Sequence, residues 1–172
     1  MANERKTEQI VRKHFEKFAD TIIIEEQKSD NAKIDKLLKT ASKKGTGQGY
    51  PEFNISFKEN SNLLIVIECK AEVSKHESKN RIKYSEYAVD GALLYASYLS
   101  KNFDVIAIAV SGDTKQSLKI SHFLHLKSEK KAIPKFDDKF LSANDYLKAY
   151  ENSEEKFRQD YNTLLEFTKE LN

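Results

Sequence analysis

Apolar residues recur along the chain with two different periods, which together predict both helices and strands. A repeat of three to four residues is typical of amphipathic helices and predicts them over residues 6–19, from 30 or 31 to about 43, and over 84–99, 144–150 and 154–171. Alternating or unbroken apolar runs predict strands over residues 21–25, 53–57, 63–71, 105–110 and 118–126. This order of elements predicts an α/β protein in which helices pack on a mixed β-sheet.

Two polar segments interrupt these elements. The first, residues 45–49, is rich in glycine and predicts a flexible loop that leads into Pro51-Glu52. A turn at residues 58–62 predicts that the strands on either side of it form an antiparallel hairpin. The second polar segment, residues 72–83, carries several basic side chains.

The overall composition limits the class of protein. A length of 172 residues, with 39% hydrophobic and 33% charged residues, fits one folded domain with a sizeable core. No apolar stretch approaches the roughly 20 residues that span a bilayer, and the polar N-terminus leads into no signal-peptide core. The single cysteine cannot form an internal disulfide, which fits a reducing, cytoplasmic setting. With a net charge of only +2, nucleic-acid binding would need a local basic surface.

Two charged residues stand at the end of the apolar run 63–67. Glu68 and Lys70 project from the same face because strand side chains alternate between faces. Charges at the end of a hydrophobic strand are unfavourable unless they pair or bind a ligand. Glu52 adds a second carboxylate at the start of the neighbouring strand, and magnesium prefers oxygen ligands of this kind. The pattern therefore favours a divalent-metal site beside a lysine, which suits phosphodiester hydrolysis.

The residue between these two charges, Cys69, offers its backbone carbonyl as a further metal ligand. Its side chain is expected to serve packing rather than nucleophilic chemistry, because it lies in the middle of a buried strand. A plain ion pair between Glu68 and Lys70 on an edge strand is the alternative interpretation of the tripeptide.

Pro51-Glu52, followed by Glu68-Cys69-Lys70 on the second strand of a hairpin, resembles the motif of the PD-(D/E)XK nuclease superfamily. Longer segments resemble the N-terminal nuclease domain of restriction–modification enzymes of the type I-like and type IIG classes, namely residues 26–31, 41–53, 67–71, 87–96 and 106–112. In those enzymes an N6-adenine DNA methyltransferase follows in the same chain. The resemblance covers about residues 6–127 and implies a restriction-endonuclease-like fold.

The resemblance also implies roles for individual residues. Glu52 and Glu68 would bind Mg²⁺, for which Mn²⁺ can substitute, and Lys70 would position the attacking water or stabilise the developing charge. Glu52 departs from the family pattern, since the usual residue there is an aspartate, one methylene shorter.

Three more acidic residues have a less certain place in this scheme. Glu8 matches a first-helix glutamate that many of these nucleases place near the metal, although an ion pair with Arg12 would explain it equally well. Glu25 and Glu26 follow a predicted strand and would either reach the same cleft, where Glu26 could add a metal ligand, or form a solvated strand end.

Basic residues flank the carboxylates in the sequence. The candidates for DNA contact are Lys43, Lys44, Lys75, His76, Lys79 and Arg81. Contacts from such residues to phosphates would position DNA without reading its bases. A solvated charged loop is the alternative, because acidic residues are interspersed among the basic ones.

We therefore expect a magnesium-dependent endonuclease domain of a restriction–modification enzyme, acting on double-stranded DNA. The expected single domain has a core over about residues 6–127 and C-terminal helices over about 142–171, and forms the N-terminal part of a longer chain with methyltransferase and specificity regions. Cleavage of both strands needs two active sites, which a dimer on DNA would supply. The alternatives are a catalytically inactive DNA-binding or assembly module with the same fold, and a partner-binding domain that uses the terminal helix.

Overall fold

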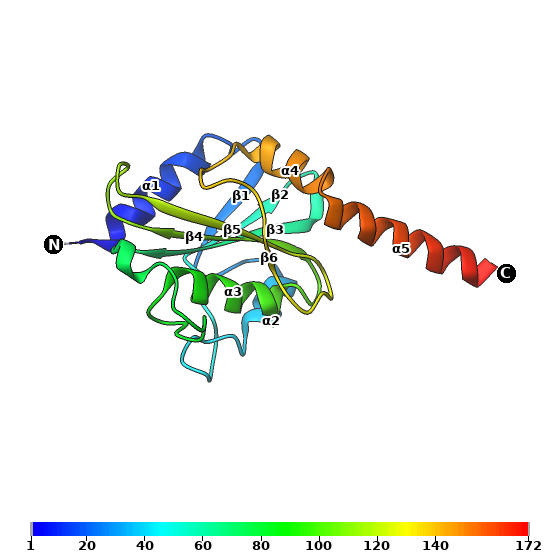
Figure 1. Ribbon diagram of the computed structural model, residues 1–172, viewed down its shortest axis with the longest axis horizontal. Coiled ribbons are helices and arrows are strands. Elements are labelled where there is room, and N and C mark those ends of the chain that lie inside the picture. Colours follow the sequence, from blue (N-terminus) through cyan, green and yellow to red (C-terminus); the bar gives the residue numbers. More distant parts are fainter. Residues whose placement is uncertain (1, 172) are drawn as a thin grey trace. The chain divides into compact units, whose positions relative to one another are not determined.

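A mixed six-stranded sheet organises the first part of the protein, as the computed structural model of residues 2–171 shows (Figure 1). The strands follow one another across the sheet in chain order, and their bounds are β1 Ile22–Glu26, β2 Phe53–Phe57, β3 Asn60–Lys70, β4 Asp104–Ser111, β5 Lys119–His125 and β6 Ile133–Pro134. Neighbours are antiparallel except for β3 and β4, which run parallel. The predicted α/β class and the predicted hairpin of β2 and β3 are therefore confirmed.

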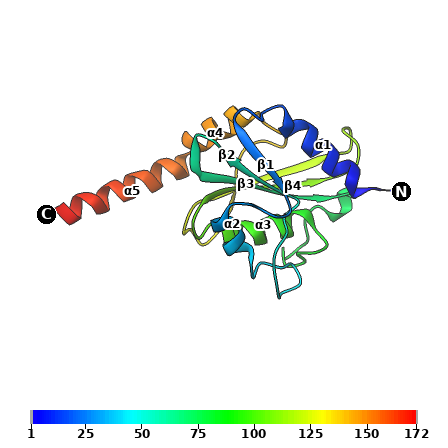
Figure 2. The same cartoon turned by 180° about the vertical axis from the view of Figure 1, so that it is seen from behind.

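Helices cover both faces of this sheet. Figures 1 and 2 show α1 (Glu4–Glu16) on one face, and α2 (Ala32–Leu38) and α3 (Ala88–Leu99) on the other. The apolar core beneath α2 and α3 is formed by side chains such as Leu64, Val66 and Ala107. Because side chains alternate between the two faces along a strand, the neighbours of these residues in β3 and β4 point to the face covered by α1.

Two of the helices are shorter than the periodicity predicted. Asn31 caps α2 by accepting from the backbone N–H groups of Lys33 and Ile34, but α2 ends at Leu38 instead of reaching residue 43. It ends there because the Leu38 carbonyl accepts from the N–H of Gly49, at 2.7 Å, and the chain turns back. Likewise α3 begins at Ala88, not at residue 84, because residues 83–87 form a turn.

The described residues fall into two compact units, one up to Phe140 and one from Leu141 onwards. The second unit contains α4 (Ala143–Glu151), whose N-terminus is capped by Ser142, and α5 (Glu154–Leu171). None of the described residues of α5 is buried. A single domain over the whole chain stays a prediction. Among the described residues, no helix is both long and apolar enough to cross a membrane.

Candidate functional site

Three glutamates meet where α1 approaches the end of the sheet. Glu4 and Glu8 come from α1, Glu52 comes from the residue before β2, and one carboxylate oxygen from each lies within 4.8 Å of the others. The two helical residues are neighbours because a spacing of four places side chains on one face of a helix. We call Glu4, Glu8 and Glu52 the acid cluster.

The start of α1 is attached directly to the end of the sheet. The Thr7 hydroxyl is buried and donates to the carbonyl of Gly112 at 2.6 Å, just beyond β4. The side chain of Asn3 caps the helix by accepting from the N–H of Arg5 at 2.9 Å. These contacts hold the first two turns of α1, and with them Glu4 and Glu8, against the ends of the central strands.

A close-packed loop brings Glu52 to the acid cluster. A methyl group added at Gly49 would lie only 2.7 Å from the Ala41 carbonyl oxygen and from a ring carbon of Tyr95, so this position has no room for a side chain. The carbonyl of Glu52 accepts from Gln27, and its N–H donates to Glu68 Oε1 at 3.1 Å. The predicted neighbourhood of Glu52 and Glu68 is therefore present, and a backbone hydrogen bond joins them.

Glu68 lies inside the protein, with both of its oxygens engaged. Its side chain is 0% exposed, and Oε2 accepts from the ammonium of Lys43 at 2.9 Å. Burial raises the pKa of Glu68, while the charge of Lys43 and the N–H of Glu52 oppose that rise. Gly91 of α3 leaves the space that this carboxylate occupies, because a methyl group there would lie 3.2 Å from Oε2. Lys43, predicted as a DNA contact, is thus the ion-pair partner of Glu68.

Lys70 borders the acid cluster from β3. Its ammonium donates to the carbonyl of Ser85 at 2.8 Å and lies 3.8 Å from Glu4 Oε1. The alternative interpretation, a plain ion pair of Lys70 with Glu68, is not the arrangement in the structure, where Glu68 pairs with Lys43 and Lys70 lies near Glu4. Between these two residues Cys69 is fully buried, and burial raises the pKa of its thiol well above the usual value, which agrees with a packing role.

The crowding of carboxylates changes the protonation of Glu52. Burial, then the charge of Glu68, then a hydrogen bond with Glu8 raise the pKa of Glu52 from an ordinary 4.5 to about 8. Near neutral pH Glu52 thus holds a proton, which reduces the electrostatic repulsion among the carboxylates of the acid cluster. A divalent cation at the same place would relieve the same repulsion and release that proton.

This raised pKa predicts how stability varies with pH when no divalent cation is bound. The folded state binds more protons than the unfolded state between the ordinary pKa of 4.5 and about 8, so the free energy of unfolding falls as pH rises through this range. Because water screens the exposed part of the carboxyl, we expect a fall of about 1–2 kcal/mol from this group. Urea unfolding in EDTA at several pH values would measure it. The variant Glu52→Gln should lose this part of the pH dependence, and an unchanged dependence would contradict the assignment.

Glu25 and Glu26 lie apart from the acid cluster. The carboxylate of Glu25 accepts from the Ser29 hydroxyl at 2.6 Å and from the N–H of Asp30 at 2.7 Å, so it organises the turn before α2. Glu26 forms an ion pair with Arg12 of α1. The structure therefore does not bring Glu26 to the predicted metal site, whereas it does place Glu8 there.

His76 is placed differently from the expected phosphate contact. It is 2% exposed, and its Nδ1 and Nε2 atoms lie 2.7 Å and 2.8 Å from the hydroxyls of Ser111 and Ser121. Burial lowers the pKa of His76 to about 4, so the ring is neutral at physiological pH. In this structure the residue attaches the segment after β3 to β4 and β5 and does not reach the surface.

The other predicted DNA contacts remain accessible to different degrees. Lys44 and Lys79 are exposed. The partly buried Lys75 lies over the ring of Tyr87, with its ammonium 5.2 Å from the ring centroid. Arg81 pairs with Glu77 at 2.7 Å. Lys44, Lys79 and Arg81 are thus at the surface, while Lys75 is partly covered.

Sequence reasoning missed Glu4, although a signal was present. The signal is the spacing of four between Glu4 and Glu8, which places two carboxylates side by side on a helix. The predicted helix begins at residue 6, whereas α1 begins at Glu4. The three carboxylates form a set of oxygen ligands of the kind that holds Mg²⁺ or Mn²⁺. The residues present therefore fit a divalent cation.

Comparison with known proteins gives one informative similarity. The chain is 38% identical over 128 residues to the type II restriction enzyme and methyltransferase RM.BcgI of Heyndrickxia coagulans, an alignment that covers 66% of this chain. It spans only 19% of that relative's length. No protein-family profile matches the chain, and no solved structure matches it.

Proposed function

We propose that this chain is a magnesium-dependent DNA endonuclease domain of the PD-(D/E)XK type, part of a restriction–modification enzyme. The observation that carries the proposal is the acid cluster, three carboxylates within 4.8 Å of one another, with the ammonium of Lys70 at 3.8 Å from Glu4. The similarity to a restriction enzyme and methyltransferase supports the same class of reaction. The substrate would be the phosphodiester backbone of double-stranded DNA.

In this proposal Glu4, Glu8 and Glu52 hold the cation directly. Glu68 and the carbonyl of Cys69 remain proposed ligands; Glu68 would first exchange its ion pair with Lys43 for the cation. A bound divalent cation supplies Lewis-acid polarisation of a phosphoryl oxygen and makes a nearby water more acidic.

The protein's own contribution is positioning and charge. The carbonyl of Ser85 orients the ammonium of Lys70 toward the acid cluster, where the ammonium can donate to the attacking water or to a phosphoryl oxygen that gains negative charge. The backbone N–H of Glu52 and the ammonium of Lys43 fix the carboxylate of Glu68 beside these groups.

The alanine variant of Lys70 tests this role. We expect Lys70→Ala to keep the fold and Mn²⁺ binding but to lower DNA cleavage by about 1,000-fold or more, because it removes a charge that acts on the reacting groups. Plasmid cleavage in Mg²⁺ would measure activity, and circular dichroism would check the fold. The exposed Lys17 provides the control variant Lys17→Ala, which should cleave normally. Cleavage by Lys70→Ala at the wild-type rate would remove the lysine from the mechanism.

One observation favours a second candidate function, an inactive DNA-binding or assembly module. Glu68 is fully buried and paired with Lys43, which is the arrangement of a structural ion pair. Calorimetry separates the two. The nuclease requires Mn²⁺ binding that Glu68→Ala weakens, whereas the inactive module would bind DNA with no requirement for a cation.

The whole enzyme would extend beyond this domain. By analogy with the relative, whose length is mostly outside the aligned part, we place the methyltransferase and specificity regions elsewhere in a longer protein. Two copies of the domain on one duplex would supply the two sites that double-strand cleavage needs.

A further inference from the structure

A polar hollow lies at the end of β3 that is opposite the acid cluster. It has a volume of about 750 Å³, and side chains from four segments line it. Lys33 and Lys36 come from α2, Lys127 follows β5, and the other polar lining groups include Ser61, Asn62 and Asn102. We call the space between Lys33, Lys36 and Lys127 the lysine hollow.

The charged residues that line the lysine hollow are all lysines, and the nearby carboxylate of Asp104, which accepts from the backbone N–H of Lys127 at 2.7 Å, is buried and does not line it. Among the described residues, no aspartate or glutamate lines it. The three lysines are exposed, and none of them forms an ion pair with another described residue. Three unpaired ammonium groups around one space repel each other and attract anions. The hydroxyl and amide groups between them can donate hydrogen bonds to phosphate and sugar oxygens.

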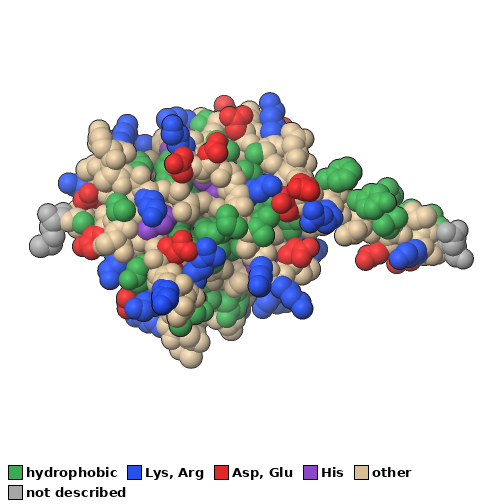
Figure 3. Space-filling view, viewed as in Figure 1, with side chains coloured by type: hydrophobic (Ala, Val, Ile, Leu, Met, Phe, Trp, Pro, Cys, Tyr) green, Lys and Arg blue, Asp and Glu red, His purple; other side chains and the backbone are tan. Residues whose placement is uncertain are grey.

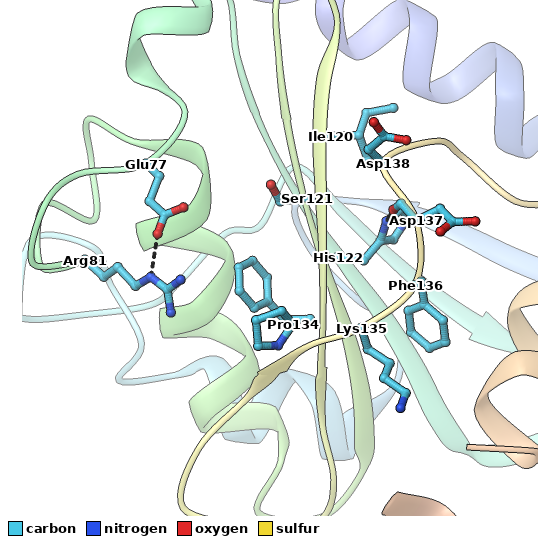
Figure 4. Close-up of a pocket in the computed structure, with 11 residues that line it drawn as sticks. Glu77, Arg81, Ile120, Ser121, His122, Pro134, Lys135, Phe136, Asp137 and Asp138 are labelled. Carbon is cyan, nitrogen blue, oxygen red and sulfur yellow. Dashed lines mark hydrogen bonds and ion pairs between the residues drawn. The ribbon is translucent and has the colours of Figure 1, made fainter. Parts of the chain in front are cut away.

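Another hollow of similar size in the same unit is lined by both acidic and basic residues, so an all-basic lining is not common to the hollows of this protein. It lies beside β5 and β6, has a volume of about 650 Å³, and contains Glu77, Asp137 and Asp138 as well as Arg81 and Lys135 (Figure 4). There the Arg81 guanidinium already pairs with Glu77. Mixed charge of this kind does not favour an anion, whereas the three lysines of the lysine hollow attract one.

Basic residues connect the lysine hollow with the candidate active site. Beyond Lys33 and Lys36 the chain continues through the exposed Lys39 to Lys43, which contacts Glu68, and to the exposed Lys44. On the face of the core that Figure 3 shows, lysine and arginine side chains lie among acidic and apolar ones.

The separation of the two places suits a single duplex. Asn62 borders the lysine hollow and Glu68 lies six residues further along β3, which corresponds to about 20 Å of strand. One turn of B-form DNA is about 34 Å long, so one duplex can reach both places with phosphates.

We propose that the lysine hollow binds a backbone phosphate of double-stranded DNA that flanks the scissile phosphate. The proposal rests on the proposed nuclease function and adds a path for the DNA, from the acid cluster along the lysines of residues 33–44. Contacts of this kind contribute affinity and register but no base specificity.

A matched pair of triple variants tests the proposal. The test variant is Lys33→Gln with Lys36→Gln and Lys127→Gln, and the control is Lys13→Gln with Lys17→Gln and Lys115→Gln, which removes the same charge from exposed positions elsewhere. Fluorescence anisotropy with a 30-base-pair duplex in Ca²⁺ gives the affinity at several salt concentrations. We expect the test variant to bind DNA about 10-fold more weakly and to lower the salt slope by about 1, and the control to change affinity less than about 2-fold.

The outcomes separate this proposal from the nuclease assignment. Equal loss of affinity in both triple variants would mean a general charge effect and would overturn the lysine hollow as a site. Saturable ATP binding that only the test variant loses, with unchanged DNA affinity, would assign the hollow to free nucleotides instead. Calorimetry with Mn²⁺ on the wild-type chain reports the acid cluster separately. If the wild-type chain does not bind Mn²⁺, the proposed nuclease function is contradicted. The DNA affinities of the two triple variants can still be compared in that case, because they are measured separately.

Discussion

Replacement of Glu52 by glutamine is expected to weaken Mn²⁺ binding by about 100-fold and to reduce DNA cleavage by about 1,000-fold or more. Glu52 is one of the three carboxylates within 4.8 Å of one another, and its backbone N–H also holds Glu68. The amide keeps the shape of the side chain but removes the charge that a cation requires. Calorimetry with MnCl₂ measures binding, and plasmid cleavage in Mg²⁺ measures activity.

The control for this prediction is Glu59→Gln, at an exposed position in the turn between β2 and β3. It removes the same charge and should leave both measurements unchanged. Glu52→Gln should also unfold with the same or a higher free energy at pH 8, because the raised pKa shows that the charged carboxylate is disfavoured in the metal-free fold. Wild-type Mn²⁺ affinity in Glu52→Gln would rule out the acid cluster as the metal site.

The variant Lys43→Met is expected to lower the free energy of unfolding by about 3 kcal/mol at pH 8, because it leaves the Glu68 carboxylate buried without a partner. Glu68 is 0% exposed and its Oε2 atom lies 2.9 Å from the Lys43 ammonium. Burial alone would lower the pKa of Lys43, but the charge of Glu68 and their hydrogen bond outweigh it, so the pKa of Lys43 is raised. Urea unfolding followed by circular dichroism measures the loss.

A second substitution separates the ion pair from simple packing. Adding Glu68→Gln to Lys43→Met removes the unpaired charge, so the double variant should recover most of the lost stability. The loss in Lys43→Met should also be smaller at pH 5, where Glu68 takes up a proton more readily. Lys44→Met, at the exposed neighbouring position, is the matched control. A loss below about 0.5 kcal/mol in Lys43→Met would show that the buried pair does not support the fold.

Local patterns in the sequence determined most of the secondary structure. The alternation of Phe53, Ile55 and Phe57 predicted β2 with its observed bounds, and the unbroken run 105–110 predicted the fully buried β4. Burial on one or both faces of a sheet dictates the residue types directly, so these strands can be recognised without tertiary information. Helix ends were less predictable. The Leu38 carbonyl accepts a hydrogen bond from the N–H of Gly49, eleven residues further along the chain. A contact between residues so far apart cannot be predicted from the local pattern.

For the candidate site, the sequence by itself determined that Glu52 and Glu68 come together, because a hairpin places neighbouring strands in register. Only the tertiary structure decided which charged groups surround them. It added Glu4 beside the predicted Glu8 on a helix packed at the end of the sheet, paired Lys43 with Glu68, and buried His76 between two strands. The physical reason is the distance along the chain between interacting residues. The alternation of side chains along a strand is local and fixes which face of the sheet each one takes. The partner of a charged side chain, in contrast, comes from distant segments that meet only when the whole domain folds.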